Sequence, residues 1–258
     1  MEYGICDLGI VSVRVEGDDR SEIVTQLLFG EHFKIIEEAE NWILVQLEKD
    51  QYTGWICKKQ YKEITYKDYD NLTINDFPVC GKKIAYLKDL DNQTMIPISY
   101  GAVLPYFHNG NCKIRKKNYE YNGDISSGNF NDHPKYAKSL LNTPYLWGGK
   151  GPYGIDCSGF TQLIYNLCGI HIPRDAYQQA ELGDKIDAFN NIQSGDLAFF
   201  QNKDGKINHV GIILENDQII HASGKVRIDQ LTEDGIYAND YKKITHMMYS
   251  IKRIHAKF

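Results

Sequence analysis

The sequence has no surplus of basic residues, no long apolar run and no paired cysteines spaced like zinc ligands. Its 258 residues carry a formal charge of -5 and a pI near 5.9. An acidic chain offers no basic face to offset phosphate repulsion, so we expect neither nucleic acid nor membrane as a partner. The longest apolar runs, such as residues 210–214, are too short to cross a bilayer.

The beginning of the chain has no stretch apolar enough for the hydrophobic region of a secretion signal. We therefore expect a cytoplasmic protein, or a secreted or periplasmic one if a leader has been removed. Six cysteines are scattered through a chain large enough to fold without disulfides. Because zinc-type spacing is absent, we predict no metal and no other cofactor. We also expect a monomer.

The spacing of apolar segments and the local composition of the chain predict three domains. Short apolar segments separated by turn residues extend from residue 9 to residue 64, and this pattern favours a small antiparallel barrel. A weaker series follows, and residues 122–133 have the Gly, Ser, Asn and Asp content of a linker. The predicted domains are residues 1–65, 66–125 and 126–258. The predicted barrel strands are residues 10–15, 23–28, 33–37, 42–47, 54–57, 84–87, 95–98, 103–107 and 112–115.

The third predicted domain has helices followed by strands, the order of an α+β fold. Pro134 opens one helix, which ends near residue 141. Residues 156–168 place apolar side chains at i, i+3, i+4, i+7 and i+8, one face of a second helix, and Gly169 ends it. An antiparallel sheet is then predicted from strands at residues 196–201, 208–214 and 218–222.

Cys157 differs from the other cysteines because it lies in the first turn of the second helix. Asp156 is suited to N-cap that helix, and the free backbone N–H groups and helix dipole favour a thiolate there. The glycines around Cys157 let a ligand approach the backbone. A lone cysteine is ordinarily a buried structural residue, but this position indicates a nucleophile.

A nucleophilic thiol needs a base with a fixed tautomer, and His209 and His221 lie on adjacent predicted strands. Either histidine alone would indicate a structural residue. A two-residue turn would pair His221 with Ile212 and put the two rings on opposite faces. A three-residue loop, residues 215–217, pairs His221 with Gly211 and makes the histidines diagonal neighbours. We predict the odd-length loop, with Gly211 leaving room beside the rings.

These residues belong to a longer ordered set. The set consists of Tyr145-Leu146-Trp147-Gly148-Gly149, Asp156-Cys157-Ser158-Gly159-Phe160, Gly169-Ile170, Pro173-Arg174, Gly195-Asp196-Leu197, His209-Val210-Gly211-Ile212 and His221-Ala222-Ser223. Over residues 136–226 it resembles the NlpC family of papain-like cell-wall endopeptidases. The resemblance implies a papain-like domain with Cys157 as nucleophile, His209 as general base and His221 as the residue orienting it. It also implies that the Tyr145 hydroxyl and the Cys157 amide hold the oxyanion.

The first two predicted domains resemble the bacterial SH3-like modules that precede such catalytic domains, on Gly30-Glu31 and Tyr52-Thr53-Gly54-Trp55. This arrangement resembles the γ-D-glutamyl-L-diamino acid endopeptidases of muropeptide recycling, which require a free N-terminal L-alanine and release L-Ala-γ-D-Glu. The resemblance assigns ammonium binding to an acid, two hydroxyls and a second acid. These are Glu31, Tyr52, Ser158 and Asp156, and Trp147 and Asp175 complete the candidate substrate-binding set. Asp175 either completes the amine pocket or caps a helix beginning near Ala176.

The expected function is therefore hydrolysis of the γ-D-Glu to diamino acid bond in wall-derived peptides, with meso-diaminopimelate or lysine as the diamino acid. One alternative is a wall-binding protein with an inactive catalytic scaffold, which the intact Cys, His, His set disfavours. Another is an amidase or acyltransferase, because an acyl-cysteine can be discharged to other nucleophiles. Titration of a thiolate and an imidazole predicts a bell-shaped pH dependence of activity.

Overall fold

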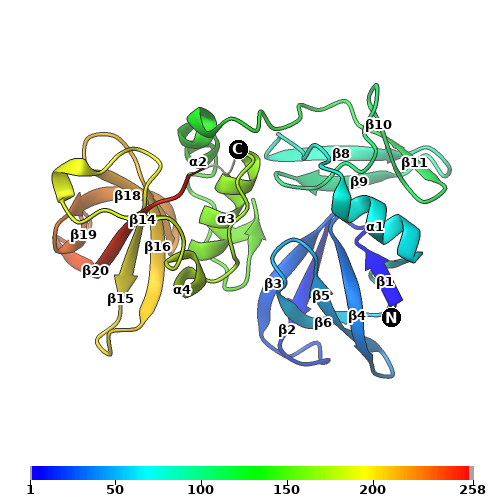
Figure 1. Cartoon of the computed structure of the whole chain (residues 1–258), viewed down its shortest axis with the longest axis horizontal. Helices are drawn as coiled ribbons and strands as arrows, with labels where there is room; N and C mark the ends of the chain where they lie inside the picture. Colours follow the sequence, from blue (N-terminus) through cyan, green and yellow to red (C-terminus); the bar gives the residue numbers. More distant parts are fainter. Residues whose placement is uncertain (1, 256–258) are drawn as a thin grey trace. The chain divides into compact units, whose positions relative to one another are not determined.

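The computed structural model describes residues 2–255, which form two compact units that meet in sequence between Ser127 and Gly128 (Figure 1). Over this part of the chain, no helix has the length and apolarity needed to span a membrane. The sequence places the domain boundary two residues earlier, after residue 125. The division of the first unit into two separate barrels stays a prediction.

The first unit contains two antiparallel sheets and one helix. A seven-stranded sheet has the order β3-β2-β6-β5-β4-β1-β7, and a four-stranded sheet has the order β10-β11-β8-β9. The elements are β1 (Glu2–Ile5), β2 (Ile10–Arg14), β3 (Ile23–Leu28), β4 (His32–Glu38), β5 (Trp42–Leu47), β6 (Thr53–Cys57), β7 (Lys62–Ile64), α1 (Tyr66–Ile74), β8 (Ile84–Asp89), β9 (Met95–Ser99), β10 (Asn111–Ile114) and β11 (Lys117–Glu120).

The second sheet shares its core with the first. Its apolar side chains pack with those of α1 and also with Ile5, Phe29 and Ile64, which come from the chain of the first sheet. The first sheet has a further core of its own around Phe33 and Val45. Because the apolar surface of the second sheet is buried partly by the first, the two sheets stabilise one another.

Most predicted strands of this unit are confirmed to within two residues, but the strand predicted at residues 103–107 is wrong. That segment forms only an isolated bridge between Val79 and Val103. Pro105 has no N–H for a ladder, and Tyr106 has a φ of 55°, which is incompatible with an extended strand. The sequence analysis missed β1, β7, β11 and α1.

The second unit is built on a sheet that closes on itself. The strand order is β14-β20-β15-β16-β17-β18-β19, and β19 also pairs with β20, so that β15 to β20 form a ring. The strands are β12 (Lys150–Gly151), β13 (Gly154–Ile155), β14 (Asp184–Lys185), β15 (Leu197–Gln201), β16 (Ile207–Ile213), β17 (Gln218–Ser223), β18 (Lys225–Thr232), β19 (Gly235–Ala238) and β20 (Lys243–Arg253). The three predicted strands are confirmed, and β18, β19 and β20 were missed.

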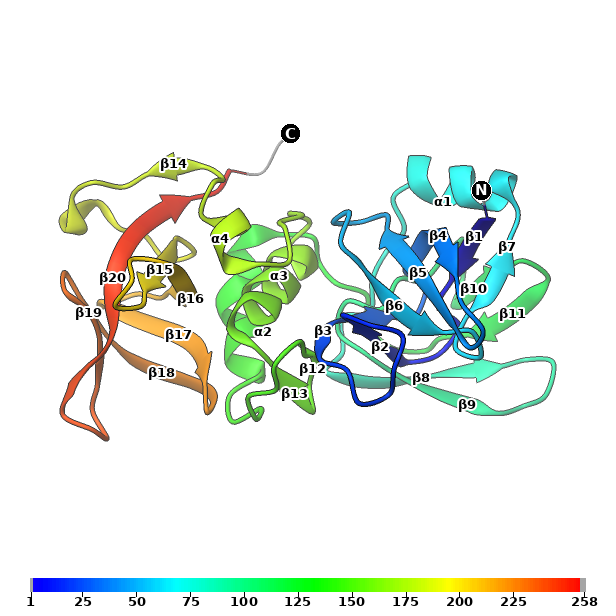
Figure 2. The same ribbon diagram turned by 90° about the horizontal axis from the view of Figure 1, so that it is seen from below.

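The helices of this unit lie together on one side of the ring (Figure 2). They are α2 (His133–Ser139), α3 (Cys157–Leu167) and α4 (Ala176–Gln179), with 3-10 turns η1 (Phe130–Asp132) and η2 (Phe189–Asn191). Both α3 and α4 pack on β16. The α+β class predicted from the sequence is thereby confirmed.

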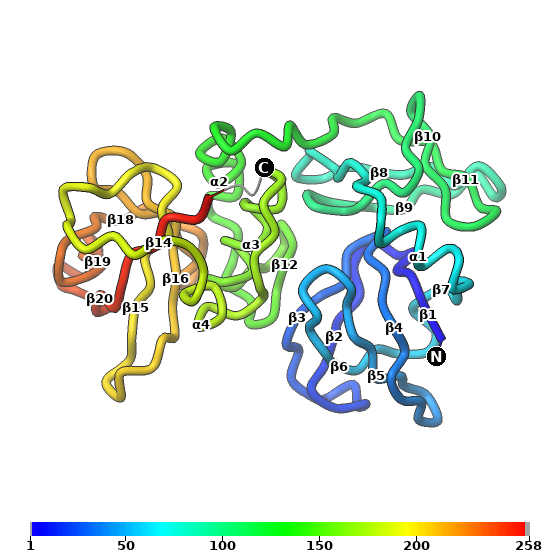
Figure 3. The backbone as a smooth tube through the Cα atoms, viewed as in Figure 1, coloured from blue at the N-terminus to red at the C-terminus, as the bar shows by residue number. Residues whose placement is uncertain are grey.

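The helix α3 is confirmed but is more enclosed than predicted. All its residues are buried, not only one apolar face, because it contacts β16 and β17 on one side and α2 and α4 elsewhere. The chain enters it from the β12–β13 hairpin and leaves it toward α4, as the trace in Figure 3 shows. Gly169 follows the helix with a φ of 79°, a conformation that favours glycine.

Candidate active site

Cys157 is the first residue of α3, as predicted. Asp156 precedes it in extended conformation and caps the helix, accepting the Gly159 N–H at 2.7 Å. Cys157 is 6% exposed, and the backbone of Val210 and of Ser158 acts on its thiol in the direction that lowers the pKa. Because Val210 follows His209 on β16, the start of the helix is joined to the strand that carries the first histidine.

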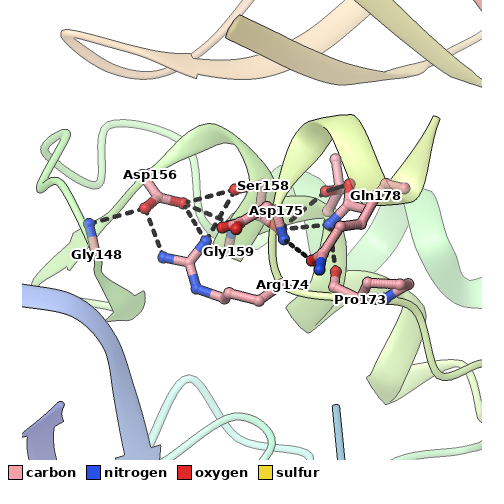
Figure 4. A network of polar contacts seen from close by, with 10 residues as sticks. Gly148, Asp156, Ser158, Gly159, Pro173, Arg174, Asp175 and Gln178 are labelled. Atoms are coloured by element: carbon pink, nitrogen blue, oxygen red, sulfur yellow. Dashed lines mark hydrogen bonds and ion pairs between the residues drawn. The ribbon is translucent and has the colours of Figure 1, made fainter. Parts of the chain in front are cut away.

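A buried ion pair fixes the loop before α3 (Figure 4). Both Asp156 oxygens accept from the Arg174 guanidinium, at 3.0 and 2.5 Å, and Oδ2 also accepts the Gly148 N–H at 2.8 Å. Arg174 is 1% exposed and also donates to Ser158 Oγ at 2.8 Å. Asp156 therefore holds the helix start, the glycine loop and a guanidinium together.

Gly159 is required by this packing. A Cβ at this position would collide with the carbonyl oxygen of Gly149 and lie 3.0 Å from Asp156 Oδ1. Gly159 thus lets the segment before β12 approach the first turn of α3.

The predicted register of the histidine strands is confirmed. Gly211 pairs with His221 and Ile213 with Ile219, which leaves residues 215–217 as a three-residue loop. His209 Nε2 lies 2.8 Å from His221 Nδ1. A Cβ on Gly211 would lie 2.9 Å from His221 Cβ and 2.7 Å from Ile219 Cδ1, so glycine is needed beside the rings.

The histidine contacts continue onto the next strand. His221 Nε2 lies 3.0 Å from Asp229 Oδ2, and Arg227 donates to both Asp229 oxygens at 2.6 and 2.8 Å. Burial alone would raise the pKa of Asp229, but the hydrogen bonds from His221 and Arg227 outweigh it and lower this pKa to about 2. Asp229 is therefore an ionised carboxylate at neutral pH.

A third histidine covers the first. The His246 ring, from β20, stacks on the His209 ring with centroids 4.2 Å apart and planes at 28°. The Phe200 ring of the neighbouring apolar cluster lies beside both, with centroids 5.8 Å from His209 and 6.0 Å from His246, and the His221 ring is 5.6 Å from that of His246. Burial lowers the pKa of His246 to about 4.

Burial also shifts the pKa values of the two predicted catalytic groups, Cys157 and His209. It raises the pKa of the Cys157 thiol to about 12, and together with His221 and His246 it lowers the pKa of His209 well below its usual value. Burial thus opposes the thiolate that the helix start favours, and the resting thiolate stays a prediction. The bell-shaped pH dependence of activity stays a prediction, and a flat profile between pH 5 and 9 would argue against this pair.

Tyr145 contacts both the turn between β17 and β18 and the strand β13 that precedes Cys157. Its N–H donates to Gly224 O at 2.9 Å, and it bridges Ile155. Burial raises the pKa of its hydroxyl, and the charges of Cys157 and Asp156 raise it further. The hydroxyl therefore stays protonated and can donate a hydrogen bond, and its role in holding the oxyanion stays a prediction.

The remaining predicted residues have varied surroundings. Trp147 is 59% exposed, and Asp175 forms a capping box with Gln178 at the start of α4, which is the second of its two predicted roles. In the first unit, Glu31 is buried rather than a solvated surface charge, and its carboxylate accepts the Leu28 N–H at 2.8 Å. Tyr52 packs against the core of the first sheet. Between residues 2 and 255, no group of three or more His, Cys, Asp and Glu side chains is placed to hold a metal ion.

Comparison with known proteins agrees with this geometry. Residues 142–245 match the NlpC/P60 family, and residues 13–60 match the bacterial dipeptidyl-peptidase Sh3 domain. The chain is 32% identical over 233 residues to the γ-D-glutamyl-L-lysine dipeptidyl-peptidase of Bacillus subtilis, covering 82% of this chain and 77% of that protein. The chain belongs to the NlpC/P60 family.

Two further relatives cover most of this NlpC/P60 protein. The γ-D-glutamyl-L-lysine dipeptidyl-peptidase of Bacillus cereus is 29% identical over 86% of this chain and 74% of its own. An NlpC/P60 family protein from Bacillus cereus has the same fold, with a TM-score of 0.82 and 22% identity over 97% of this chain and 99% of that one. The predicted papain-like fold with an N-terminal SH3-like domain is confirmed, and the protein is a cysteine peptidase.

Sequence reasoning gave no role to four residues of this NlpC/P60 site, although it quoted the first of them in the motif set: Arg174, Arg227, Asp229 and His246. The hairpin of β17 and β18 pairs His221 with Arg227 and Ile219 with Asp229. A tight turn recognised at Gly224 would have put Arg227 and Asp229 on the His221 face, because side chains two residues apart share a face. No local signal identifies Arg174 as the partner of Asp156 or His246 as the ring on His209.

Proposed function

We propose that this peptidase hydrolyses the bond between γ-D-Glu and a diamino acid in peptidoglycan-derived peptides, releasing L-Ala-γ-D-Glu. The observation that carries the proposal is the 2.8 Å contact of His209 with His221 beside the helix-start Cys157. It occurs in a chain 32% identical to a protein named γ-D-glutamyl-L-lysine dipeptidyl-peptidase. Those relatives favour lysine as the diamino acid, with meso-diaminopimelate as the other candidate.

In the proposed acylation step, Cys157 Sγ attacks the γ-carbonyl carbon of D-Glu while its proton passes to His209. The oxyanion is held by the backbone N–H of Cys157, which the first turn of a helix leaves without an intrahelical partner, and by the Tyr145 hydroxyl. His209 then returns the proton to the leaving α-amine, and the C–N bond breaks. His221 orients His209 throughout this step.

In the proposed deacylation step, a water molecule replaces the leaving amine. His209 removes a proton from this water as it attacks the thioester, and Cys157 leaves and regains a proton. The products are L-Ala-γ-D-Glu and the free enzyme. Both proposed steps start from a neutral His209 imidazole, the state toward which burial moves its pKa.

A dipeptidyl-peptidase must recognise the amine at the beginning of its substrate. We propose that Glu31, Tyr52 and Ser158 bind this ammonium, since a buried ammonium requires carboxylate charge and hydrogen bonds. Asp156 belongs to the same proposed set, although its oxygens already hold Arg174 and its main contribution is to position Ser158. Trp147 and Asp175 are proposed to border the peptide.

The test is mass spectrometry of the products from L-Ala-γ-D-Glu-L-Lys and its meso-diaminopimelate counterpart, each with a free and an acetylated N-terminus. Release of L-Ala-γ-D-Glu from the free peptides alone would support both the bond and the amine recognition. Equal cleavage of acetylated peptides would reject the ammonium site, and Glu31→Gln should then have no effect on KM. A product of acyl transfer in place of hydrolysis would reject the proposed reaction.

The recycling role and the cytoplasmic location are part of the same proposal. An enzyme of recycling acts on small wall peptides after their release, so intact peptidoglycan should be a much poorer substrate than the tripeptide. Fractionation of cells that produce the full-length protein, with the activity assayed in each fraction, tests the location.

A further inference from the structure

The contacts of the two histidines end on a carboxylate that is itself held by a guanidinium. His209, His221 and Asp229 lie on the adjacent strands β16, β17 and β18, and each contacts the next as a diagonal neighbour. His221 is 1% exposed and Asp229 is 4% exposed. Arg227 fixes the plane of the carboxylate by donating to both oxygens, the geometry for which a guanidinium is suited.

When an imidazole orients the base, the position of its ring hydrogen is not fixed by its chemistry alone. An amide or a carboxylate in the same place does not have this ambiguity. A neutral imidazole has one N–H and one lone pair, and either ring nitrogen can carry the hydrogen. If His221 carried it on Nδ1, it would donate to His209 Nε2. The hydrogen of His209 would then be on Nδ1, and that nitrogen would be unable to accept a proton.

Asp229 removes this ambiguity. An ionised carboxylate only accepts hydrogen bonds, so His221 Nε2 must carry the hydrogen that lies toward Asp229. Because burial lowers the pKa of His221 and the ring is neutral, its Nδ1 is left with a lone pair and accepts from His209 Nε2–H. The lone pair of His209 is then on Nδ1. One carboxylate thus determines the hydrogen positions of both rings.

We propose that Asp229 is a positioning residue of the peptidase, acting through His221 to hold His209 in the tautomer whose Nδ1 accepts a proton. Arg227 supports it by fixing the carboxylate. This inference rests on the proposed role of His209 as the base. A purely structural ion pair would stabilise the fold without any effect on the tautomers.

The charges around His221 are consistent with this role. His209 and His246 face it from β16 and β20, and Asp229 and Arg227 face it from β18. Arg227 also pairs with Asp240, at 3.0 Å. The negative charge of Asp229 favours the imidazolium that forms on His209 during proton transfer. The positive charge of Arg227 offsets that of Asp229 before the reaction begins.

The test compares Asp229→Asn with a matched control, Asp196→Asn. Asp196 is a buried carboxylate of the same unit that accepts from the Arg253 guanidinium at 2.8 Å through both oxygens. Within the described residues its carboxylate also accepts the Gln193 N–H at 2.8 Å, and it is not bonded to a histidine ring. The first readout is the tautomer of His209 and His221 from ring ¹⁵N chemical shifts of the substrate-free protein. We expect both rings as Nε2–H in the wild type and the control, and a shift toward Nδ1–H in Asp229→Asn.

The second readout is the rate of peptide hydrolysis. Asp229→Asn should lower kcat about 10- to 100-fold with little change in KM, the range expected when an outer partner of an active histidine is lost. Asp196→Asn should change kcat less than about 3-fold. In a His221→Asn background the amide oxygen accepts from His209 without help, so Asp229→Asn should have an effect of less than about 3-fold there.

Unchanged ring shifts in a folded Asp229→Asn protein, or an equal loss of kcat in the His221→Asn background, would overturn the inference. If Asp229→Asn does not fold, Arg227→Gln provides the second variant, since it loosens the carboxylate and should broaden or shift the same ring signals. The ring shifts require no substrate. They therefore test this inference even if the proposed substrate is wrong, a result that product analysis of the wild type would give separately.

Discussion

The site has two parts, the start of α3 with Cys157 and the strands with the histidines. Each part contains a buried aspartate held by an arginine, but the two ion pairs contact different partners. Asp156 and Arg174 bind backbone N–H groups and a hydroxyl at the start of α3. Asp229 contacts the His221 imidazole, and Arg227 donates to Asp229. The first pair fixes the shape of the loop around the nucleophile, whereas the second is placed to fix hydrogens. The same pair of residue types thus serves packing in one half and acid–base chemistry in the other.

The largest difference should appear when each arginine is removed. Arg174→Met leaves the Asp156 carboxylate buried without its guanidinium, and breaking a buried pair in this way costs about 3–5 kcal/mol. Arg227→Met should cost less, because the Arg227 side chain is partly exposed and His221 still donates to Asp229. Urea unfolding of both variants measures the difference in free energy. Equal losses would contradict the distinction.

A pair of glycine substitutions perturbs the same two halves by steric means. Gly159→Ala forces a Cβ against the Gly149 carbonyl, and Gly211→Ala forces one against His221 and Ile219. Overpacking costs about 1–3 kcal/mol of stability. We expect the loss for Gly159→Ala to lie at the upper end of this range, because a backbone carbonyl cannot change rotamer as a side chain can. Gly211→Ala should lower kcat at least tenfold. Thermal unfolding and peptide hydrolysis, measured on both proteins, would contradict this if Gly211→Ala kept full kcat.

The three histidines should also make the free energy of unfolding depend on pH. The pKa values of His209, His221 and His246 are all lowered by burial, so the unfolded chain binds protons first as the pH falls below about 6.5. Stability is therefore present above that pH and is lost as the pH falls toward the folded pKa of each ring. Each such histidine contributes a slope of about 1.4 kcal/mol per pH unit.

His246→Phe isolates one of these groups, since a phenyl ring can keep the stack on His209 but does not titrate. Between pH 6.5 and about 4, the folded pKa of His246, the slope of unfolding free energy should decrease by up to about 1.4 kcal/mol per pH unit. Urea titrations at several pH values measure this slope. An unchanged slope would show that His246 is not held neutral.

The comparison also explains which parts of the site were predictable. The helix start at Cys157 and the parity of the 215–217 loop follow from local spacing, and the structure agrees with both. The burial that raises the pKa of the Cys157 thiol did not follow, because it comes from elements distant in sequence. Strands β18 to β20 were missed, and with them Asp229 and His246. The error at residues 103–107 came from counting apolar residues while ignoring Pro105.

The most direct test of the central claim, that Cys157 carries the peptidase activity, compares the two ends of α3. Cys157 and Cys168 are both buried, and burial raises the pKa of each thiol to about 12, so neither burial nor acidity distinguishes them. Hydrolysis of L-Ala-γ-D-Glu-L-Lys should fall below about one-thousandth of the wild-type rate in Cys157→Ala and remain near the wild-type rate in Cys168→Ala. Retained hydrolysis in a folded Cys157→Ala protein would contradict the account.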